Sequence, residues 1–151
     1  MNATAHENVT EGRCLCGGVR LRVRDLPDEI SACHCTYCTR FGGGLQMGIE
    51  VPVANTEVSG PVKTHRSTVL AERAWCDTCG SALWMRSVEG DDAELLWVSP
   101  GLFDNAGGGR LVRVVYADRH PDGFWLEGAE VERVSRAEYE AREAHIAEGA
   151  A

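Results

Sequence analysis

Apolar and polar residues alternate along much of this chain in short runs, a period of two that is typical of strands burying one face. The clearest run is 19–24, where Val19, Leu21 and Val23 alternate with arginines. Further strands, separated by turns rich in Gly, Pro, Asn and Asp, are expected at residues 30–33, 45–51, 81–88, 94–99 and 112–116. Short pieces between residues 53 and 75 add a β-meander. The pattern predicts a mainly β fold.

Both ends of the chain depart from this pattern. Ser135-Arg136-Ala137-Glu138 is a capping box, which predicts a short C-terminal helix running toward Ala147 at the periphery of the domain. The opening residues show no apolar periodicity and are expected to form a flexible arm. The chain is therefore divided into an arm over 1–11, one folded domain over 12–134 and a helix over 135–151.

Parity within two of the predicted strands, 81–88 and 94–99, assigns their core positions. The expected core residues are Leu83, Met85, Leu96 and Val98. Trp84 and Trp97 lie on the opposite faces of these strands. They either line a pocket or pack under a loop. Core or packing is the favoured role, because aromatic side chains contribute chiefly buried area.

Composition and charge narrow the class of protein. The 151 residues are 44% hydrophobic and 25% charged, values typical of one soluble globular domain. A formal net charge of -8 opposes binding to phosphate backbones, so no nucleic-acid partner is expected. No apolar run reaches the roughly 20 residues needed to span a bilayer, so no membrane association is expected. The polar start lacks the features of a secretory signal, and we expect the protein in the cytoplasm.

The seven cysteines change the picture most, because they fall into three tight groups at positions 14/16, 33/35/38 and 76/79. An odd number of clustered thiols in a reducing compartment favours metal ligation over disulfides. Disulfides, scattered buried thiols and a redox CxxC pair are the alternatives. The redox interpretation leaves the other two groups unexplained.

The segment Cys33-His34-Cys35-Thr36-Tyr37-Cys38 places three thiols within six positions. This density favours a zinc ion held by Cys33, Cys35 and Cys38, with a fourth position open to water or substrate, as in reactive zinc sites. His34 lies between two ligands. Because neighbouring side chains in an extended segment point in opposite directions, we expect His34 to face away and to form a local hydrogen bond, with a ligand role as the alternative.

The remaining cysteines, Cys14, Cys16, Cys76 and Cys79, supply the four ligands of a closed structural zinc site. Its two arms lie about 60 residues apart, so the ion would cross-link distant strands and its loss should unfold the domain. The sequence thus predicts two zinc ions per chain.

Two residues are candidates for substrate binding. Arg40 follows the three-cysteine segment and would brace the thiolates or bind an anionic substrate, although a surface salt bridge is equally consistent with its position. His120 lies in a turn with aromatic neighbours, where it would contact substrate or serve as an ordinary loop histidine. The arginines of segment 19–24 form either a solvated face or an anion-facing rim.

The ordered motifs Gly12-x-Cys14-x-Cys16-Gly17, Cys33-His34-Cys35-x-x-Cys38 and Cys76-x-x-Cys79-Gly80-Ser81 resemble those of the glutathione-dependent formaldehyde-activating enzyme family over about residues 12–125. The resemblance implies an Mss4-like, zinc-stabilised β-sheet domain with the two zinc sites given above. It also implies a carbon–sulfur lyase-type enzyme whose substrates are a small thiol such as glutathione and a small aldehyde. The founding activity of the family adds glutathione to formaldehyde and gives S-(hydroxymethyl)glutathione.

Two other classes of function compete with this interpretation. One is a zinc-stabilised binding module without catalysis, in which the Cys33 group binds no exchangeable ligand. The other is a thiol oxidoreductase of similar fold, in which one cysteine is a nucleophile. The oxidoreductase requires a reactive thiol outside the metal sites. The lyase requires two zinc sites and no free thiol.

Overall fold

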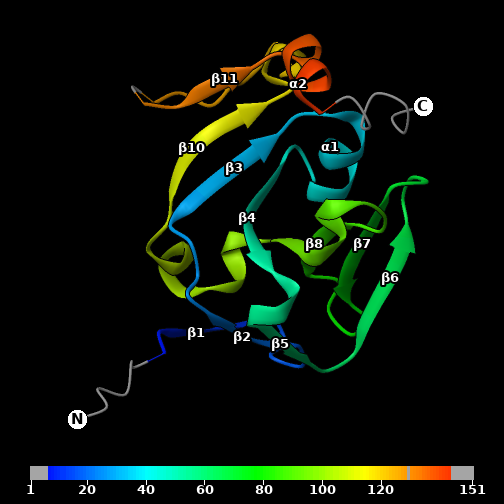
Figure 1. Cartoon of the computed structure of the whole chain (residues 1–151), viewed down its shortest axis with the longest axis vertical. Helices are drawn as coiled ribbons and strands as arrows, with labels where there is room; N and C mark the ends of the chain where they lie inside the picture. Colours follow the sequence, from blue (N-terminus) through cyan, green and yellow to red (C-terminus); the bar gives the residue numbers. More distant parts are fainter. Residues whose placement is uncertain (1–6, 129, 144–151) are drawn as a thin grey trace.

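The structure is a computed structural model, and it describes residues 7–128 and 130–143. Strands form two sheets, a small one of three strands and a large one of eight (Figure 1). The small sheet has the order β1 (Val9–Arg13), β2 (Arg20–Arg24), β5 (Thr56–Ser59). The large sheet has the order β11 (Glu132–Val134), β10 (Arg110–Val115), β3 (Glu29–Cys33), β4 (Gln46–Pro52), β9 (Leu95–Val98), β8 (Ala82–Ser87), β7 (Ala71–Cys76), β6 (Val62–Arg66).

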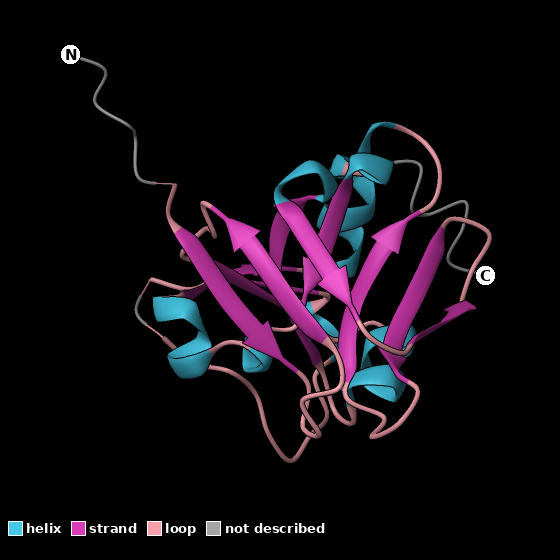
Figure 2. Ribbon diagram, turned by 90° about the horizontal axis from the view of Figure 1, so that it is seen from below, coloured by secondary structure: helices cyan, strands magenta, loops and turns pink. Residues whose placement is uncertain are grey.

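The pairing is antiparallel except along one edge of the large sheet, where β10 runs parallel to both β3 and β11. Two α-helices, α1 (Thr36–Gly42) and α2 (Arg136–Arg142), lie toward one end of the molecule, and the small sheet lies toward the other (Figure 1). The remaining elements are short 3₁₀ turns, η1 (Val53–Asn55), η2 (Asp91–Glu94), η3 (Pro100–Leu102), η4 (Asp104–Gly108) and η5 (Ala117–Arg119). Seen from below, strands are the main regular element, with short helical segments around them (Figure 2). The predicted mainly β fold is confirmed.

The core lies between the two sheets. The alternation that predicts β2 is confirmed, because Val19, Leu21 and Val23 are buried while Arg20 and Arg22 are exposed. These three apolar side chains belong to one cluster with residues of the large sheet, which include Ile49, Val51, Leu83, Leu96 and Val98. Burial of this shared face holds the small sheet against the large one.

The ends of the chain agree with the predicted elements in part. The capping box is present, with the Ser135 hydroxyl accepting from the backbone of Glu138 and the Glu138 carboxylate accepting from the backbone of Ser135. The predicted continuation of the helix toward Ala147 lies outside the described residues. β1 starts at Val9 and pairs with β2, so regular structure begins inside the segment assigned to the arm. The first six residues of that arm lie outside the described residues.

The predicted parity of β8 is wrong beyond Leu83. Trp75 pairs with Ala82 and Ala74 with Trp84, which leaves Leu83 as the extra residue of a bulge. The bulge reverses the faces, so Trp84 joins the core and Met85 turns to the cavity described below. Leu83, Leu96 and Val98 are buried as predicted.

Trp97 lines the cavity, one of the two roles expected for it. Its indole lies across β4 at Gly48, where any Cβ would overlap the ring. The indole Nε1 donates to Ser31 Oγ on the next strand at 2.9 Å. A glycine at position 48 is therefore what allows the aromatic ring to lie flat across the sheet.

Among the described residues, no helix combines the length and the apolar character needed to cross a bilayer.

Gly48→Ala is expected to destabilise the fold by about 1–3 kcal/mol, because the added methyl group must displace the Trp97 indole. Urea unfolding followed by tryptophan fluorescence measures the change. Gly101→Ala is the matched control, since a Cβ at Gly101 meets nothing within 4 Å. Equal stability of the two variants would contradict the placement of the indole.

Candidate metal centres

Four sulfurs of the predicted structural site converge between the two sheets. The Sγ atoms of Cys14, Cys16, Cys76 and Cys79 all lie within 4.8 Å of one another. Cys14 and Cys16 are separated by 3.6 Å between sulfurs, and Cys16 and Cys76 by 3.9 Å. Zinc–thiolate bonds of about 2.3 Å in a tetrahedron require sulfur separations of about 3.8 Å. The spacing of these sulfurs therefore fits a closed zinc site.

The backbone around these sulfurs is built from tight turns that depend on glycine. Gly17 follows the first pair with φ of 76° and Gly80 follows the second with φ of 77°, values that glycine adopts without strain. Backbone amides of Gly18 and Val19 donate to Cys16 Sγ at 3.4 Å and Cys14 Sγ at 3.2 Å. Such N–H donors stabilise sulfur as thiolate.

Ser81 links the two arms of this site, a role the sequence reasoning did not assign. Its hydroxyl accepts from the backbone of Leu15 at 3.0 Å and lies 3.2 Å from Cys79 Sγ. The side-chain hydrogen bond from Ser81 lowers the pKa of Cys79 to about 5. The signal in the sequence is a small hydroxyl residue directly after the CxxC turn and its glycine.

The second group of sulfurs lies where β3 ends and α1 begins. Cys33 is the last residue of β3, Cys35 is the N-cap of α1, and Cys38 lies in its first turn. The amide of Cys35 donates to Cys33 Sγ and the amide of Cys38 donates to Cys35 Sγ, each at 3.4 Å. All three sulfurs lie within 4.8 Å of one another.

The sequence predicts one helix, at the C-terminal end, and misses α1, which follows the second cysteine of this motif. The helix has seven residues and one buried side chain, Cys38, so no apolar period marks it in the sequence. Its cap is the sulfur of Cys35 rather than one of the usual hydroxyl or carboxylate caps. Its end is marked by Gly43, which has φ of 81°.

His34 lies outside the sulfur cluster, as expected for its position between two ligands. Its ring is 3% exposed and packs 6.0 Å from the ring of Phe124. The expected local hydrogen bond is wrong, because neither buried ring nitrogen has a partner among the described residues. Burial lowers the pKa of His34, so its ring is neutral at neutral pH.

The electrostatics of the three-sulfur group favour a cation. Hydrogen bonds from Cys33 and then Cys38 lower the pKa of Cys35 to about 2. Hydrogen bonds with Cys35 and Cys38, followed by burial, raise the pKa of Cys33 well above its usual range. The group thus carries one negative charge readily and resists a second. A divalent metal ion would compensate the further charge, so the donor set fits zinc.

A cavity of about 570 Å³ is lined in part by Cys33, Cys35 and Cys38. Its aromatic lining consists of Tyr37, Trp97, Tyr116 and Tyr139. Its arginines are Arg73, Arg86, Arg113, Arg119 and Arg136, and its carboxylates are Glu50, Asp92, Glu140 and Glu143. The three cysteines therefore lie in the wall of a partly enclosed chamber of ligand size that also carries aromatic and charged side chains.

Arg73 of β7 is the contact with the sulfurs that sequence reasoning missed. It is 5% exposed, and its Nη2 donates to Cys38 Sγ at 3.4 Å. The two residues are 35 positions apart, so local motifs could not pair them. The only signal is an arginine just ahead of the Cys76 turn.

Neither residue predicted to bind substrate lines this cavity. Arg40 is exposed on α1. His120 is part-buried outside the cavity, where Nδ1 lies 2.8 Å from the Pro121 carbonyl oxygen and the ring packs 5.6 Å from that of Trp125. The arginine face of β2 also lies elsewhere, with Arg22 only 3.8 Å from a Glu11 carboxylate oxygen in an exposed ion pair.

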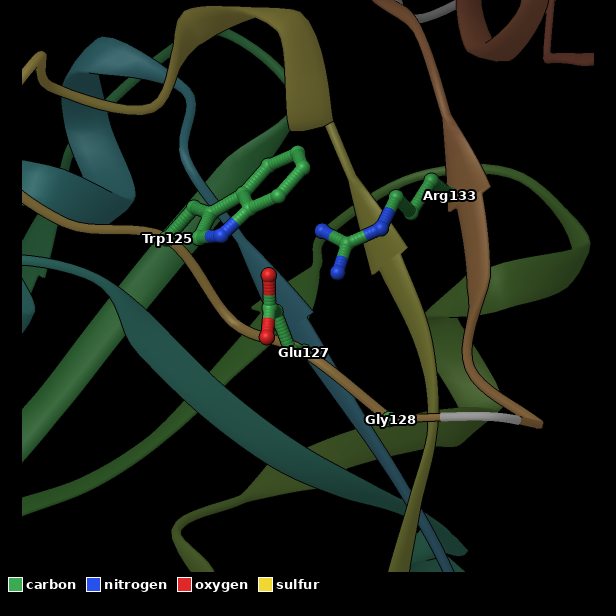
Figure 3. Close-up of a pocket in the computed structure, with 4 residues that line it drawn as sticks. All are labelled: Trp125, Glu127, Gly128 and Arg133. Atoms are coloured by element: carbon green, nitrogen blue, oxygen red, sulfur yellow. The ribbon is translucent and has the colours of Figure 1, made fainter.

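A second hollow of about 470 Å³ is lined by Trp125, Glu127, Gly128 and Arg133. The Arg133 guanidinium lies over the Trp125 ring at 4.3 Å, and the Glu127 carboxylate points toward the space between them (Figure 3). This hollow holds no cysteine and no histidine. The cavity over the three sulfurs is therefore the candidate site.

Comparison with known proteins agrees with this geometry. A model of the family described as glutathione-dependent formaldehyde-activating enzyme matches residues 9–118. A Halomonas elongata protein named for the same activity is 34% identical over 85 residues, which are 50% of this chain and 54% of that protein. An uncharacterized lyase of Schizosaccharomyces pombe is 25% identical over 95 residues, or 61% of this chain and 69% of that protein. The chain thus spans about half the length of the first of these relatives.

Among solved structures, a crystal structure of a Rhodobacter sphaeroides protein aligns with a TM-score of 0.52 at 20% identity. The alignment covers 62% of this chain and 87% of that one. At this identity the similarity shows a shared fold.

Replacement of one cysteine from each group should separate the two sites. Cys76→Ser is expected to prevent folding, because it opens the cross-link between sheets. Cys35→Ser should leave the domain folded with one metal ion fewer, because serine is itself a preferred helix N-cap. Metal analysis combined with thermal unfolding followed by circular dichroism measures both effects. Equal losses of folding in the two variants would contradict the division into structural and reactive sites.

Proposed function

The chain belongs to the glutathione-dependent formaldehyde-activating enzyme family, and on this premise we propose that it is a zinc-dependent carbon–sulfur lyase-type enzyme acting on thiol–aldehyde adducts. Glutathione and formaldehyde, which combine as S-(hydroxymethyl)glutathione, are the model substrate pair. The observation that carries the proposal is a cluster of three closely spaced sulfurs opening together into a cavity of ligand size.

The proposal assigns the seven cysteines to two roles. Cys33, Cys35 and Cys38 would hold the reactive zinc, and Cys14, Cys16, Cys76 and Cys79 the structural zinc. A zinc ion held by these three cysteines would supply a Lewis acid that lowers the pKa of an incoming substrate thiol and favours its thiolate form. Three thiolate ligands donate more negative charge than three histidines, so this donor set suits thiol capture better than water activation.

The lining of the cavity supports an anionic thiol as the substrate. Arginines project into it from several elements, among them Arg86 of β8, Arg113 of β10 and Arg119 of η5. A thiol that carries carboxylates, as glutathione does, would be attracted and oriented by these guanidinium groups. The proposal places substrate contacts on these side chains in place of Arg40 and His120.

Tyrosines near the sulfurs can assist at the aldehyde oxygen. Tyr116 and Tyr139 pack with the cysteines of the site and line the cavity. Burial raises the pKa of both tyrosines, so their hydroxyls keep their protons at neutral pH. In the addition step, the thiolate sulfur bonds to the aldehyde carbon while the oxygen takes up a proton. The Tyr116 hydroxyl donates to Glu140 Oε1 at 3.2 Å, so the neutral Tyr139 hydroxyl is the one placed to donate a hydrogen bond to that oxygen as charge develops on it.

The rival functions differ in what they require of the cysteines. A thiol oxidoreductase needs a reactive thiol outside the metal sites, yet all seven cysteines fall within the two metal-binding groups. A binding module would leave the three-sulfur group without an exchangeable ligand. A reducing compartment, for which we propose the cytoplasm, would keep the sulfurs available for metal.

Titration of glutathione into cobalt-substituted protein should change the sulfur-to-cobalt charge-transfer band, because a fourth sulfur enters the reactive site. S-Methylglutathione, which cannot form a thiolate, is the matched control and should leave the band unchanged. A screen of thiols and aldehydes should detect adduct formation that Cys35→Ser abolishes. A band unresponsive to every thiol, together with intact metal content, would favour the binding module.

A further inference from the structure

Resting on the proposed function, we propose that Arg73 is a positioning residue of the reactive site. Through its contact with Cys38, the Arg73 guanidinium partly neutralises the negative charge of the three-sulfur group. This lowers the electrostatic repulsion that a fourth, negatively charged sulfur would meet. No cysteine motif includes this residue, and its role follows from contacts made across the cavity.

The guanidinium of Arg73 is held at both ends. Nη2 donates to Cys38 Sγ at 3.4 Å, and Nη1 donates to Ser67 Oγ at 2.5 Å. Its Nε is buried and has no partner among the described residues. The hydroxyl of Ser67 thus fixes the far side of the group while the near side faces sulfur.

Aromatic side chains of α1 complete the arrangement. The Arg73 guanidinium carbon lies 5.9 Å from the centroid of Tyr37 and 5.7 Å from that of Phe41. These residues are four positions apart and therefore share one face of the helix. Both distances lie within the range in which a ring attracts a cation. The same short helix that carries Cys38 thereby orients the charge that contacts its sulfur.

The location of this charge implies a role, because a buried guanidinium is unfavourable unless an anion or an equivalent group compensates it. Arg73 is 5% exposed, and the structure directs one of its donors at a ligand sulfur. Three thiolates on a divalent ion carry a net charge of about -1, and an adjacent guanidinium brings the local sum close to zero. An incoming thiolate then meets a nearly neutral site rather than an anionic one.

Arg113 supplies a matched comparison within the same cavity. It lines the chamber from β10, and its Nε is also buried without a partner among the described residues. Of these two arginines, Arg73 is the one that donates a hydrogen bond to a sulfur of the group. Removal of Arg113 therefore takes one positive charge from the cavity and leaves the sulfur contact in place.

The test uses full-length, cobalt-loaded protein as wild type and as Arg73→Met, Arg73→Lys and Arg113→Met. Without added thiol, Arg73→Met should move the sulfur-to-cobalt band to lower energy, because a sulfur that loses a hydrogen bond becomes a stronger electron donor. Arg113→Met should leave the band in place. With glutathione, affinity should fall by about tenfold or more in Arg73→Met, and Arg73→Lys should recover part of it.

The outcomes separate this inference from the proposed function. An unchanged band and unchanged affinity in a folded Arg73→Met protein with both metals would overturn the inference while wild-type thiol binding still supports the lyase. If the wild-type protein binds no thiol but Arg73→Met still shifts the charge-transfer band, the proposed lyase function is refuted, whereas the contact of Arg73 with the Cys38 sulfur is supported. If Arg73→Met fails to fold, Arg73→Lys decides: wild-type values in both measurements overturn the inference.

Discussion

Four sulfurs from two different sheets converge at one point, where a bound metal ion would cross-link the sheets. Cys14 and Cys16 lie in the turn between β1 and β2 of the small sheet, whereas Cys76 ends β7 of the large sheet and Cys79 lies in the turn that follows it. Closing a loop of about 60 residues removes much of the conformational freedom of the unfolded chain. The cross-link also fixes β7, and β7 carries Arg73 toward the other metal-binding group. The position of these four cysteines is thereby linked to the position of one wall of the candidate cavity.

Much of this architecture was predictable, because its determinants are local. Alternation marks β2, the hydroxyl and carboxylate of a capping box mark α2, and cysteine spacing marks both metal-binding groups. Prediction failed where the determining contact is distant or the local signal is weak. The bulge at Leu83 is set by pairing with β7, and it alone reverses the faces of Trp84 and Met85. No periodicity within β8 could reveal it.

The candidate site shows the same contrast between local features, which the sequence predicts, and distant contacts, which it does not. Its three cysteines lie within six consecutive positions. The arginines and tyrosines that line the cavity come from segments far apart in the sequence, between Tyr37 and Tyr139. Arg40 is a sequence-based candidate because it lies close to the cysteines. The position of a residue on a helix decides which way its side chain points, and Arg40 is exposed on α1. Arg73 had no neighbouring motif and contacts sulfur. Proximity in sequence is a good guide to metal ligands and a poor guide to the residues that surround them.

The cap of α1 has a consequence for how this corner of the molecule assembles. A helix of seven residues is too short to persist through its own hydrogen bonds. Its first turn is tied to the sulfur of Cys35, and its aromatic face packs on a guanidinium that itself contacts Cys38. We therefore expect binding of an ion by the three-sulfur group to stabilise this helix. An ion bound by the three-sulfur group would therefore also order the helix that forms one side of the cavity proposed to hold the substrate.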